Sequence, residues 1–366
     1  MTPDPGLASW LQLALTPGIG PATLQRLLRQ FGLPQQALVR TRAELGAFLT
    51  PAVLTALDSD AVARAVAQAL DWAAQPGHSV ITLADETYPP LLLEIPDPPA
   101  VLYARGRTEL LASPALAIVG SRNATQQGEA NAEALGKALS AAGLTIVSGL
   151  ALGIDAAAHR GGLAGTGSTI AVLGTGIDVV YPSRNAALAT EIAGRGLLVS
   201  EFPLGTAPAA QNFPRRNRLI SGLARGCLVV EAALASGSLI TARAAAEQGR
   251  EVFAIPGSIH SPLAKGCHAL IKSGAKLVES AEDVLAELSG FRPSGYASTT
   301  RAAPETQDAG LLRHMGHDPV DVDSLCSRAG LSAEQVSSEL LRLELDGRVA
   351  ALPGGLYQRL EKGQRR

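Results

Sequence analysis

The residues best suited to chemistry form one run, QNFPRRNRLISGLARG, at positions 211–226. The run has no acidic residue, it has an aromatic ring at Phe213, and it carries four arginines: Arg215, Arg216, Arg218 and Arg225. Guanidinium groups pair with phosphate oxygens and an aromatic ring stacks on a base, so this composition is typical of a groove for single-stranded nucleic acid. The alternative is that one or two of the arginines pair with carboxylates of the fold, such as Glu191, Glu201 or Glu231.

A second set of residues suited to ligand binding lies in loops that directly follow short runs of β-branched residues. These loops contain Gly120-Ser121-Arg122, the stretch SGLALGID at 148–155 with Gly149 and Gly153, and GSLIT at 237–241 with Ser238. Glycine lets a backbone approach a ligand closely, and a helix that begins after such a loop directs free N–H groups toward an anion. Arg122 can pair with phosphate through two N–H groups, and the serines can donate hydroxyls. Together the loops predict a phosphate-bearing ligand.

The elements that must position these residues are predicted from periodicity. Apolar strands alternate with Ala-rich helices such as 128–142 and 239–248, which predicts an α/β fold with a Rossmann-like doubly wound parallel sheet. Ligands of that fold lie beyond the carboxyl ends of the strands. Because the run 211–226 lies between two of the strands, we expect it to overhang the same edge. The expected strands are 116–120, 145–149, 169–174, 197–200, 228–231 and 252–256.

Motifs for cofactor chemistry are missing from the sequence. The dinucleotide pattern GxGxxG is not completed after Gly174 and Gly176, and no GxxxxGK[ST] phosphate loop occurs. The histidines and cysteines have no spacing that predicts a metal site or a disulfide framework, and Cys227 and Cys267 are expected to be small core residues. We therefore expect neither a metal nor a cofactor.

Two positions keep an enzymatic alternative open. Asp155 and His159 could form an acid-base couple, although a contact one helical turn apart is the favoured interpretation. Glu231, at the end of an apolar strand, could activate water or could accept hydrogen bonds from neighbouring loop amides. The alternative function is a nucleotide-binding or nucleotide-hydrolysing enzyme of a related Rossmann-like fold that uses Glu231 and Asp155.

Charge and composition limit the location and the partners. The chain has 366 residues and a formal net charge of −2 at pH 7, which by itself argues against nucleic acid. Only the segment 106–290 has more basic than acidic residues, 15 against 14, and it contains the run 211–226. The cysteines form no CxxC pair, no apolar run has the length of a membrane span, and the start MTPDPG lacks the bases of a secretory signal. A cytoplasmic protein is expected.

The chain is expected to divide into three domains and a linker. Residues 1–105 predict a helical domain of the SAM or helix-hairpin-helix kind that includes a proline-rich connection. This connection, YPPLLLEIPDPPAVLYARG from position 88, can be neither helix nor central strand. The glycine turn at 16–23 could face a DNA phosphate or simply join two helices. Residues 106–290 hold the sheet, 291–308 are a predicted linker, and 309–366 predict a winged helix. The second helix of the winged helix is acidic, which favours contact with a protein over contact with DNA.

Several motifs resemble those of a known family. Gly120-Ser121-Arg122, SGLALGID at 148–155, FPRRNRLISGL at 213–223, GSLITA at 237–242 and IPG at 255–257 resemble, in order, the motifs of the DNA processing protein A (DprA, Smf) family. YPPLL at 88–92 and PPAVLYARG at 98–106 are similar to the lead-in to that family's core. The resemblance covers essentially the whole chain.

The resemblance implies a non-enzymatic protein that binds single-stranded DNA in natural transformation. Such a protein protects incoming DNA, forms a homodimer through the Rossmann-like domain, loads the RecA recombinase and relieves inhibition by single-strand binding protein. Many relatives have a lysine near the YPSRN stretch, where Arg184 is the expected substitute. Arg225 lies next to a strand and is expected to be structural. The predicted DNA contacts are Gly120, Ser121, Arg122, Gly149, Gly153, Arg184, Phe213, Arg215, Arg216, Asn217, Arg218 and Ser238.

Overall fold

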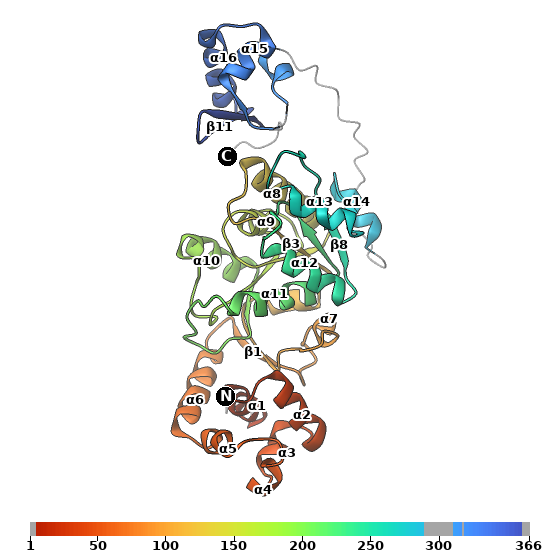
Figure 1. Cartoon of the computed structure of the whole chain (residues 1–366). Helices are drawn as coiled ribbons and strands as arrows, with labels where there is room; N and C mark the ends of the chain where they lie inside the picture. Colours follow the sequence, from red (N-terminus) through yellow and green to blue (C-terminus); the bar gives the residue numbers. More distant parts are fainter. Residues whose placement is uncertain (1–4, 289–309, 317, 361–366) are drawn as a thin grey trace.

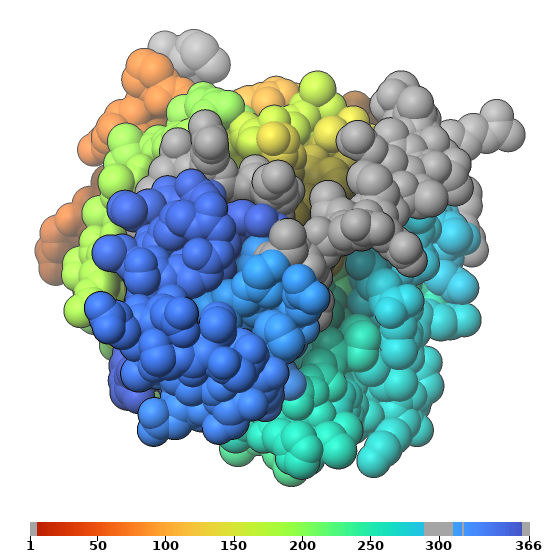
Figure 2. Space-filling model, turned by 90° about the horizontal axis from the view of Figure 1, so that it is seen from above, coloured from red at the N-terminus to blue at the C-terminus, as the bar shows by residue number. Residues whose placement is uncertain are grey.

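The computed structural model describes residues 5–288, 310–316 and 318–360 (Figure 1). The predicted linker at 291–308 lies outside the described residues. In Figure 1 the N-terminal helices lie at the bottom, the large sheet with its helices in the middle, and the winged helix at the top. Seen from above, the winged helix in blue lies in front of the sheet domain, and the cyan residues around α13 and α14 extend beside it (Figure 2).

The N-terminal part is helical, as the sequence predicts. Its glycine turn joins α1 to α2, with Ile19 buried and Gly18 at φ +91°, where a Cβ would collide with Val53. Trp72 of α6 packs edge-on against Tyr103 of the sheet, with ring centroids 5.7 Å apart, which joins the helices to the sheet. The helices are α1 (Pro5–Leu15), α2 (Pro21–Phe31), α3 (Pro34–Leu38), α4 (Arg42–Leu45), α5 (Pro51–Leu57) and α6 (Asp60–Ala73).

A nine-stranded sheet forms the middle of the molecule, in the order β1-β2-β6-β5-β4-β3-β7-β8-β9. From β6 to β9 neighbouring strands are parallel, whereas β2 is antiparallel to both β1 and β6. The predicted doubly wound sheet is therefore confirmed. Its parallel strands are β3 (Ala115–Val119), β4 (Thr145–Ser148), β5 (Thr169–Val172), β6 (Leu197–Ser200), β7 (Gly226–Val229), β8 (Glu251–Ala254) and β9 (Lys276–Leu277).

Helices cover both faces of this sheet, because its central strands are apolar on both sides. One face packs against α7 (Pro90–Leu93), α11 (Asn212–Gly222), α12 (Ser238–Glu247) and α13 (Lys265–Lys272). The other face packs against α8 (Gln126–Ala141), α9 (Ile154–Leu163), α10 (Ala186–Arg195) and α14 (Ala281–Glu287). The run 211–226 thus becomes α11 and the start of β7, with α11 between β6 and β7 in the chain.

The prediction for the proline-rich stretch 88–106 is wrong in two places. Pro90–Leu93 forms the short helix α7, since a proline in the first helical turn loses no hydrogen bond there. Val101–Gly106 forms β2, an interior strand that pairs with β1 (His78–Thr82) on one side and β6 on the other. The prolines end at Pro99, so the strand itself contains none. The sheet begins at β1, and the predicted domain boundary at 105/106 falls inside β2.

The winged helix agrees closely with its prediction. α15 (Val322–Ala329) ends at Gly330, which has the left-handed conformation at φ +67°, and α16 (Ala333–Leu345) begins with a Ser332 cap. β11 (Val349–Leu352) and β12 (Leu356–Arg359) form the hairpin, and β10 (Val320–Asp321) pairs with β12. Leu325, Val336 and Leu340 are among its buried core residues.

Candidate nucleic-acid interface

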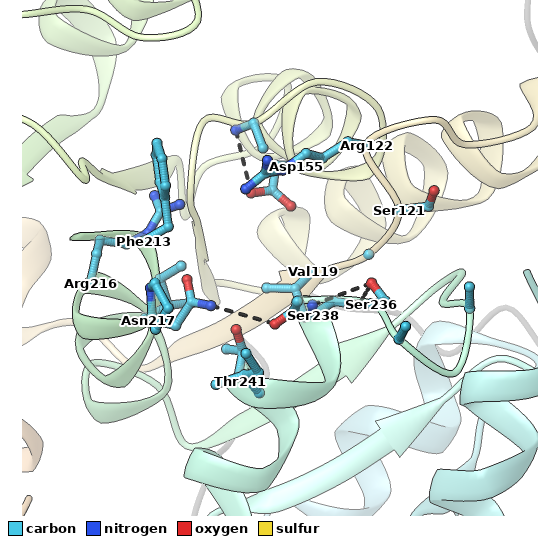
Figure 3. A pocket seen from close by; sticks show the side chains of 18 of the residues that line it. Val119, Ser121, Arg122, Asp155, Phe213, Arg216, Asn217, Ser236, Ser238 and Thr241 are labelled. Atoms are coloured by element: carbon cyan, nitrogen blue, oxygen red, sulfur yellow. Dashed lines mark hydrogen bonds between the residues drawn. The ribbon is translucent and has the colours of Figure 1, made fainter. Parts of the chain in front are cut away.

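A cavity of about 670 Å³ opens at the carboxyl ends of β3 and β7. Strands β4 to β6 lie to one side of β3 and strands β7 to β9 to the other, so this edge is the switch point at which Rossmann-like sheets bind ligands. The cavity is lined by the loop after β3, by one side of α11, and by the loop that leads into α12 (Figure 3). Ala151 and Asp155 at the start of α9 and Leu263 complete the wall, so it includes one carboxylate. Of the predicted contacts, these lie in its wall: Gly120, Ser121, Arg122, Phe213, Arg216, Asn217 and Ser238.

Arg122 and Phe213 form the part of the wall best suited to nucleic acid. The Arg122 guanidinium carbon lies 5.4 Å from the centroid of the Phe213 ring, a cation-π distance. Arg122 is exposed and Phe213 is half-buried. Phe213 lies against Gly174, where a Cβ would come within 2.9 Å of the ring, so this glycine makes room for the aromatic side chain. One exposed cation and one partly exposed ring from distant parts of the chain thus meet at the cavity.

The serines of the wall stand beside a helix start. Ser238 is the first residue of α12, and its backbone N–H donates to Ser236 Oγ at 3.3 Å. The hydroxyls of Ser236 and Ser238 are 2.7 Å apart, and Asn217 Nδ2 donates to the Gly237 carbonyl at 3.5 Å. The next two amides of α12 are also bonded, Leu239 N–H to the Ser236 carbonyl and Ile240 N–H to the Gly237 carbonyl, so the helix start offers the cavity the positive end of its dipole rather than free N–H groups. Sequence reasoning missed Ser236, although it stands only two residues from Ser238.

Of the three loop glycines predicted as DNA contacts, Gly120 lies in the cavity wall, whereas Gly149 and Gly153 do not line the cavity. Gly153, at φ +71°, would put a Cβ 2.4 Å from the Ser121 carbonyl oxygen, and Gly149 would put one 2.5 Å from the Arg216 guanidinium. Both lie behind the cavity wall, outside its lining residues. Gly120 is in the wall, and a Cβ there would meet Ile154 at 2.6 Å. These glycines allow the loops after β3 and β4 to pack against each other.

Arg216 belongs to the cavity wall but is almost completely buried, with only 4% of its surface exposed. Its guanidinium donates to the carbonyl oxygens of Gly149 and Val172. Burial lowers its pKa to about 10, while nearby Asp155 acts in the opposite direction, so the side chain stays charged at neutral pH. Burial raises the pKa of Asp155, and the charge of Arg216 opposes that rise. Arg216 therefore supplies positive potential from below and ties two strand ends together.

Arg218 and Arg215 lie on either side of one buried carboxylate. Arg218, 13% exposed, donates to Glu201 at 2.6 Å and to Asp97 at 2.7 Å. Arg215 is 53% exposed, lies 3.9 Å from Glu201, and has its guanidinium carbon 5.4 Å from the Phe202 ring centroid. The internal pairing considered from the sequence is thus present for Arg218. Neither arginine is among the residues that line the cavity.

Two further basic side chains lie away from the cavity. Arg184 is exposed in the short helical turn Ser183–Asn185, outside the cavity wall. Arg225 is half-buried, and its backbone bonds to Ala115 beside β3 and to Glu251 beside β8. That position suits the structural role expected for Arg225.

The carboxylates of the enzymatic alternative are held by hydrogen bonds to the protein itself. Glu231 accepts from the Thr125 amide at 2.9 Å and from its hydroxyl at 2.6 Å, at the start of α8. Asp155 accepts from the Gly149 amide at 3.1 Å and from the Ala151 amide at 3.4 Å.

His159 is fully buried and accepts from the Leu150 amide at 3.2 Å. Its other ring nitrogen lies 2.7 Å from Thr169 Oγ1, so its ring bonds to the loop and to β5 rather than to Asp155. Burial lowers its pKa to about 3. The two side chains therefore hold the same loop separately, and an acid-base couple is not formed.

The described residues contain neither a metal-binding cluster nor a helix that could span a membrane. Among residues 5–288, 310–316 and 318–360, no group of three or more His, Cys, Asp or Glu side chains could hold a metal ion. Within the same ranges, every helix is too short or too polar to cross a bilayer.

Fold and site together define a class of protein: a Rossmann-like domain with a cationic and aromatic cavity at its switch point, flanked by helices and a winged helix. A family model described as DNA recombination-mediator protein A matches residues 79–289, and a DprA winged helix domain model matches residues 296–355. The chain belongs to the DNA recombination-mediator protein A family.

Relatives and solved structures agree with this family. Protein Smf from Escherichia coli strain K12 is 46% identical over 308 residues, which cover 82% of each chain. The structure of DNA processing protein A from Streptococcus pneumoniae superposes with a TM-score of 0.63 at 39% identity, covering 77% of this chain and 97% of that one. The corresponding structure from Helicobacter pylori concerns a single-stranded DNA binding mode of that protein. It superposes with a TM-score of 0.52 at 31% identity, covering 57% of this chain and 94% of that one.

Proposed function

We propose that this protein binds single-stranded DNA at the cavity and acts as a recombination mediator. The observation that carries the proposal is the Arg122 guanidinium over the Phe213 ring, in the wall of a cavity that is also lined by the start of α12. A ring offers a stacking surface to any base, while the guanidinium and the positive end of the α12 dipole attract phosphate. The membership of the recombination-mediator family and the single-strand binding mode described for the Helicobacter pylori relative support the same function.

Within this proposal the predicted contacts divide into two groups. The groups that face solvent or the cavity touch the DNA: Gly120, Ser121, Arg122, Arg184, Phe213, Arg215, Asn217 and Ser238. The others act from beneath, because their side chains or backbones are committed to internal contacts: Gly149, Gly153, Arg216 and Arg218.

The finer parts of the proposal come from the family. We infer that the protein protects incoming single strands in natural transformation, loads RecA, acts on strands covered by single-strand binding protein, and works as a cytoplasmic homodimer without catalytic turnover. The division into a helical domain, a sheet domain and a winged helix is part of the same proposal. The acidic residues exposed on α16, among them Glu334 and Glu344, suit contact with a protein better than contact with phosphate.

A salt titration of oligonucleotide binding tests the central claim. Fluorescence anisotropy with a labelled single strand and with the matched duplex should show tighter binding of the single strand. The logarithm of the binding constant should fall linearly with the logarithm of salt concentration, by roughly 0.7 per phosphate contact. Arg122→Ala should weaken binding at least about tenfold while the urea unfolding curve stays unchanged. A binding constant that does not change with salt concentration, or an Arg122→Ala variant that binds like the parent, would contradict the proposed DNA-binding site.

The enzymatic alternative is tested separately. The protein would be incubated with nucleoside mono-, di- and triphosphates, and release of base or phosphate followed by chromatography. We expect no turnover, because Glu231 and Asp155 are engaged by Thr125 and by loop amides. Turnover that disappears in Glu231→Gln would establish the enzyme instead.

A further inference from the structure

Tyr181 is an exposed aromatic residue beside the proposed site. Its surface is 46% exposed, and its ring centroid lies 5.7 Å from that of Phe213, with an angle of 39° between the ring planes. Tyr181 is not among the residues that line the cavity, and it comes from the loop after β5 rather than from α11. The exposed ring of Tyr181 therefore offers an aromatic face to solvent beside Phe213.

The spacing of the two rings decides what they can hold. A base inserted between two rings needs their planes roughly 7 Å apart, because each contact takes roughly 3.5 Å. At 5.7 Å and with a tilt of 39° there is no room for a base between Tyr181 and Phe213. The rings therefore form one aromatic pair, in which Phe213 lines the cavity and Tyr181 lies outside it.

The loop that carries Tyr181 is held in place by hydrogen bonds on both sides of the ring. Before it, Thr175 Oγ1 donates to the Val179 carbonyl at 2.6 Å. After it, the buried Asn185 donates to the carbonyl oxygens of Leu150 at 2.8 Å and Ala151 at 3.1 Å. The same loop carries the exposed Arg184. A fixed ring loses little freedom when it binds, so the surface is organised before any ligand arrives.

The Tyr181 hydroxyl makes no hydrogen bond within the described part of the chain. Its ring, rather than its hydroxyl, is therefore the part that contacts the protein. This separates the stacking surface from any polar role and provides a matched variant, because Tyr181→Phe keeps the ring and removes only the hydroxyl.

We propose that Tyr181 is a second stacking residue: the strand that enters the cavity at Phe213 leaves over Tyr181, where the next base stacks, and its phosphate then passes Arg184. This inference rests on the proposed function. It adds the path of the strand from the cavity toward Arg184 and a specific contact residue, Tyr181, outside the cavity. Stacking accepts any base, so the step requires no particular sequence.

The test measures the affinity of the full-length protein for labelled oligo-dT in parallel at several salt concentrations. Tyr181→Ala should weaken binding at least about fivefold, the lower range for loss of one stacked base, with the salt slope unchanged. Tyr181→Phe should bind within about twofold of the parent. Arg184→Ala should instead change the salt dependence: the salt slope should become shallower by roughly 0.7, because the variant lacks one phosphate contact.

Controls keep the outcomes separate. Leu345→Ala removes an exposed apolar side chain, 82% exposed on the winged helix, and should bind like the parent. Tyr181→Leu keeps an apolar side chain without an aromatic face; it replaces Tyr181→Ala if that variant unfolds early in urea, and it should show the same loss. If the folded Tyr181→Ala or Tyr181→Leu variant bound the oligonucleotide as tightly as the parent, the inference would be overturned while the proposed function stayed intact. A parent protein that does not bind the oligonucleotide at all would instead refute the proposed function.

Discussion

Two regions meet at the strand-end edge of the sheet, an outer surface and a buried layer beneath it. The outer surface has Arg122, Phe213 and Arg215, whose side chains face solvent or the cavity. The buried layer has Arg216 and Arg218, which donate to carbonyl oxygens or carboxylates. Arg215, Arg216 and Arg218 all stand on α11, so neither composition nor local charge distinguishes the two regions. The difference teaches that the direction of a side chain around the helix decides whether an arginine can meet a ligand.

Loss of Arg218 should have the largest effect. Arg218→Ala would leave the Glu201 carboxylate, 4% exposed, without its near partner, so the free energy of unfolding should fall by about 3 kcal/mol. Urea unfolding monitored by circular dichroism measures this change. Arg215→Ala is the matched control on the same helix and should alter stability by less than about 0.5 kcal/mol, because Arg215 is exposed. If the Arg218→Ala variant were fully stable but no longer bound DNA, Arg218 would be a DNA contact of the outer surface rather than a buried structural residue.

The second prediction concerns pH and the buried layer. The folded pKa of His159, about 3, lies below its unfolded value of about 6.5, so between these values the unfolded chain binds more protons. Stability should therefore fall as the pH drops from 6.5 toward 3, by about 1.4 kcal/mol per pH unit from this residue alone. Urea unfolding of the parent and of His159→Gln at pH 7, 5.5 and 4.5 isolates the contribution. Equal pH slopes for the two proteins would show that His159 is not held neutral in the fold.

On the outer surface, Phe213→Ala should reduce binding rather than stability. Loss of one stacked base is worth about 1 to 3 kcal/mol of binding free energy, measured by anisotropy with a single-stranded oligonucleotide. Phe48→Ala removes another half-buried ring, in the helical part of the chain, and should leave binding unchanged. If both variants bound equally well, Phe213 would belong to the buried layer despite its position in the cavity wall.

The smallest effect is expected for Arg215. Arg215→Ala should lower the affinity only a few-fold and make the salt dependence shallower by roughly 0.7, the value for one phosphate contact. Arg64→Ala, at an exposed position on α6, provides the comparison and should change neither quantity. An unchanged salt slope for Arg215→Ala would show that Arg215 does not contact phosphate and that the DNA contacts lie at the cavity, with Arg122.

Most of the fold could be predicted from the sequence, because its signals are local. Alternating apolar strands and helices indicated the parallel sheet, and the break at Gly330 between two helical runs indicated the winged helix. Three strands of the sheet, β1, β2 and the two-residue β9, are missing from the prediction. β2 follows a cluster of prolines, and its pairing with β6 depends on residues almost a hundred positions away in the chain.

The sequence predicts which residues gather at the candidate site, but it does not predict which of them are exposed and which are buried. The strand-end loops and the run 211–226 were expected at one edge, and the structure brings Arg122 to Phe213 across 91 positions of sequence. Tyr181 and Ser236 were missed, since a single tyrosine or serine in a loop has no periodic signal. Their significance comes only from neighbours that the fold supplies.

The sequence by itself determined the kinds of groups available at the sheet edge: glycines that permit close loop packing, arginines without local acids, and one aromatic ring among them. Only the tertiary structure decided which arginines are free. The partners of Arg218 lie 17 and 121 residues away, and the carbonyl groups that hold Arg216 lie 44 and 67 residues away. A charge is either solvated or compensated according to what surrounds it in space, and the fold brings those surroundings together from distant parts of the chain.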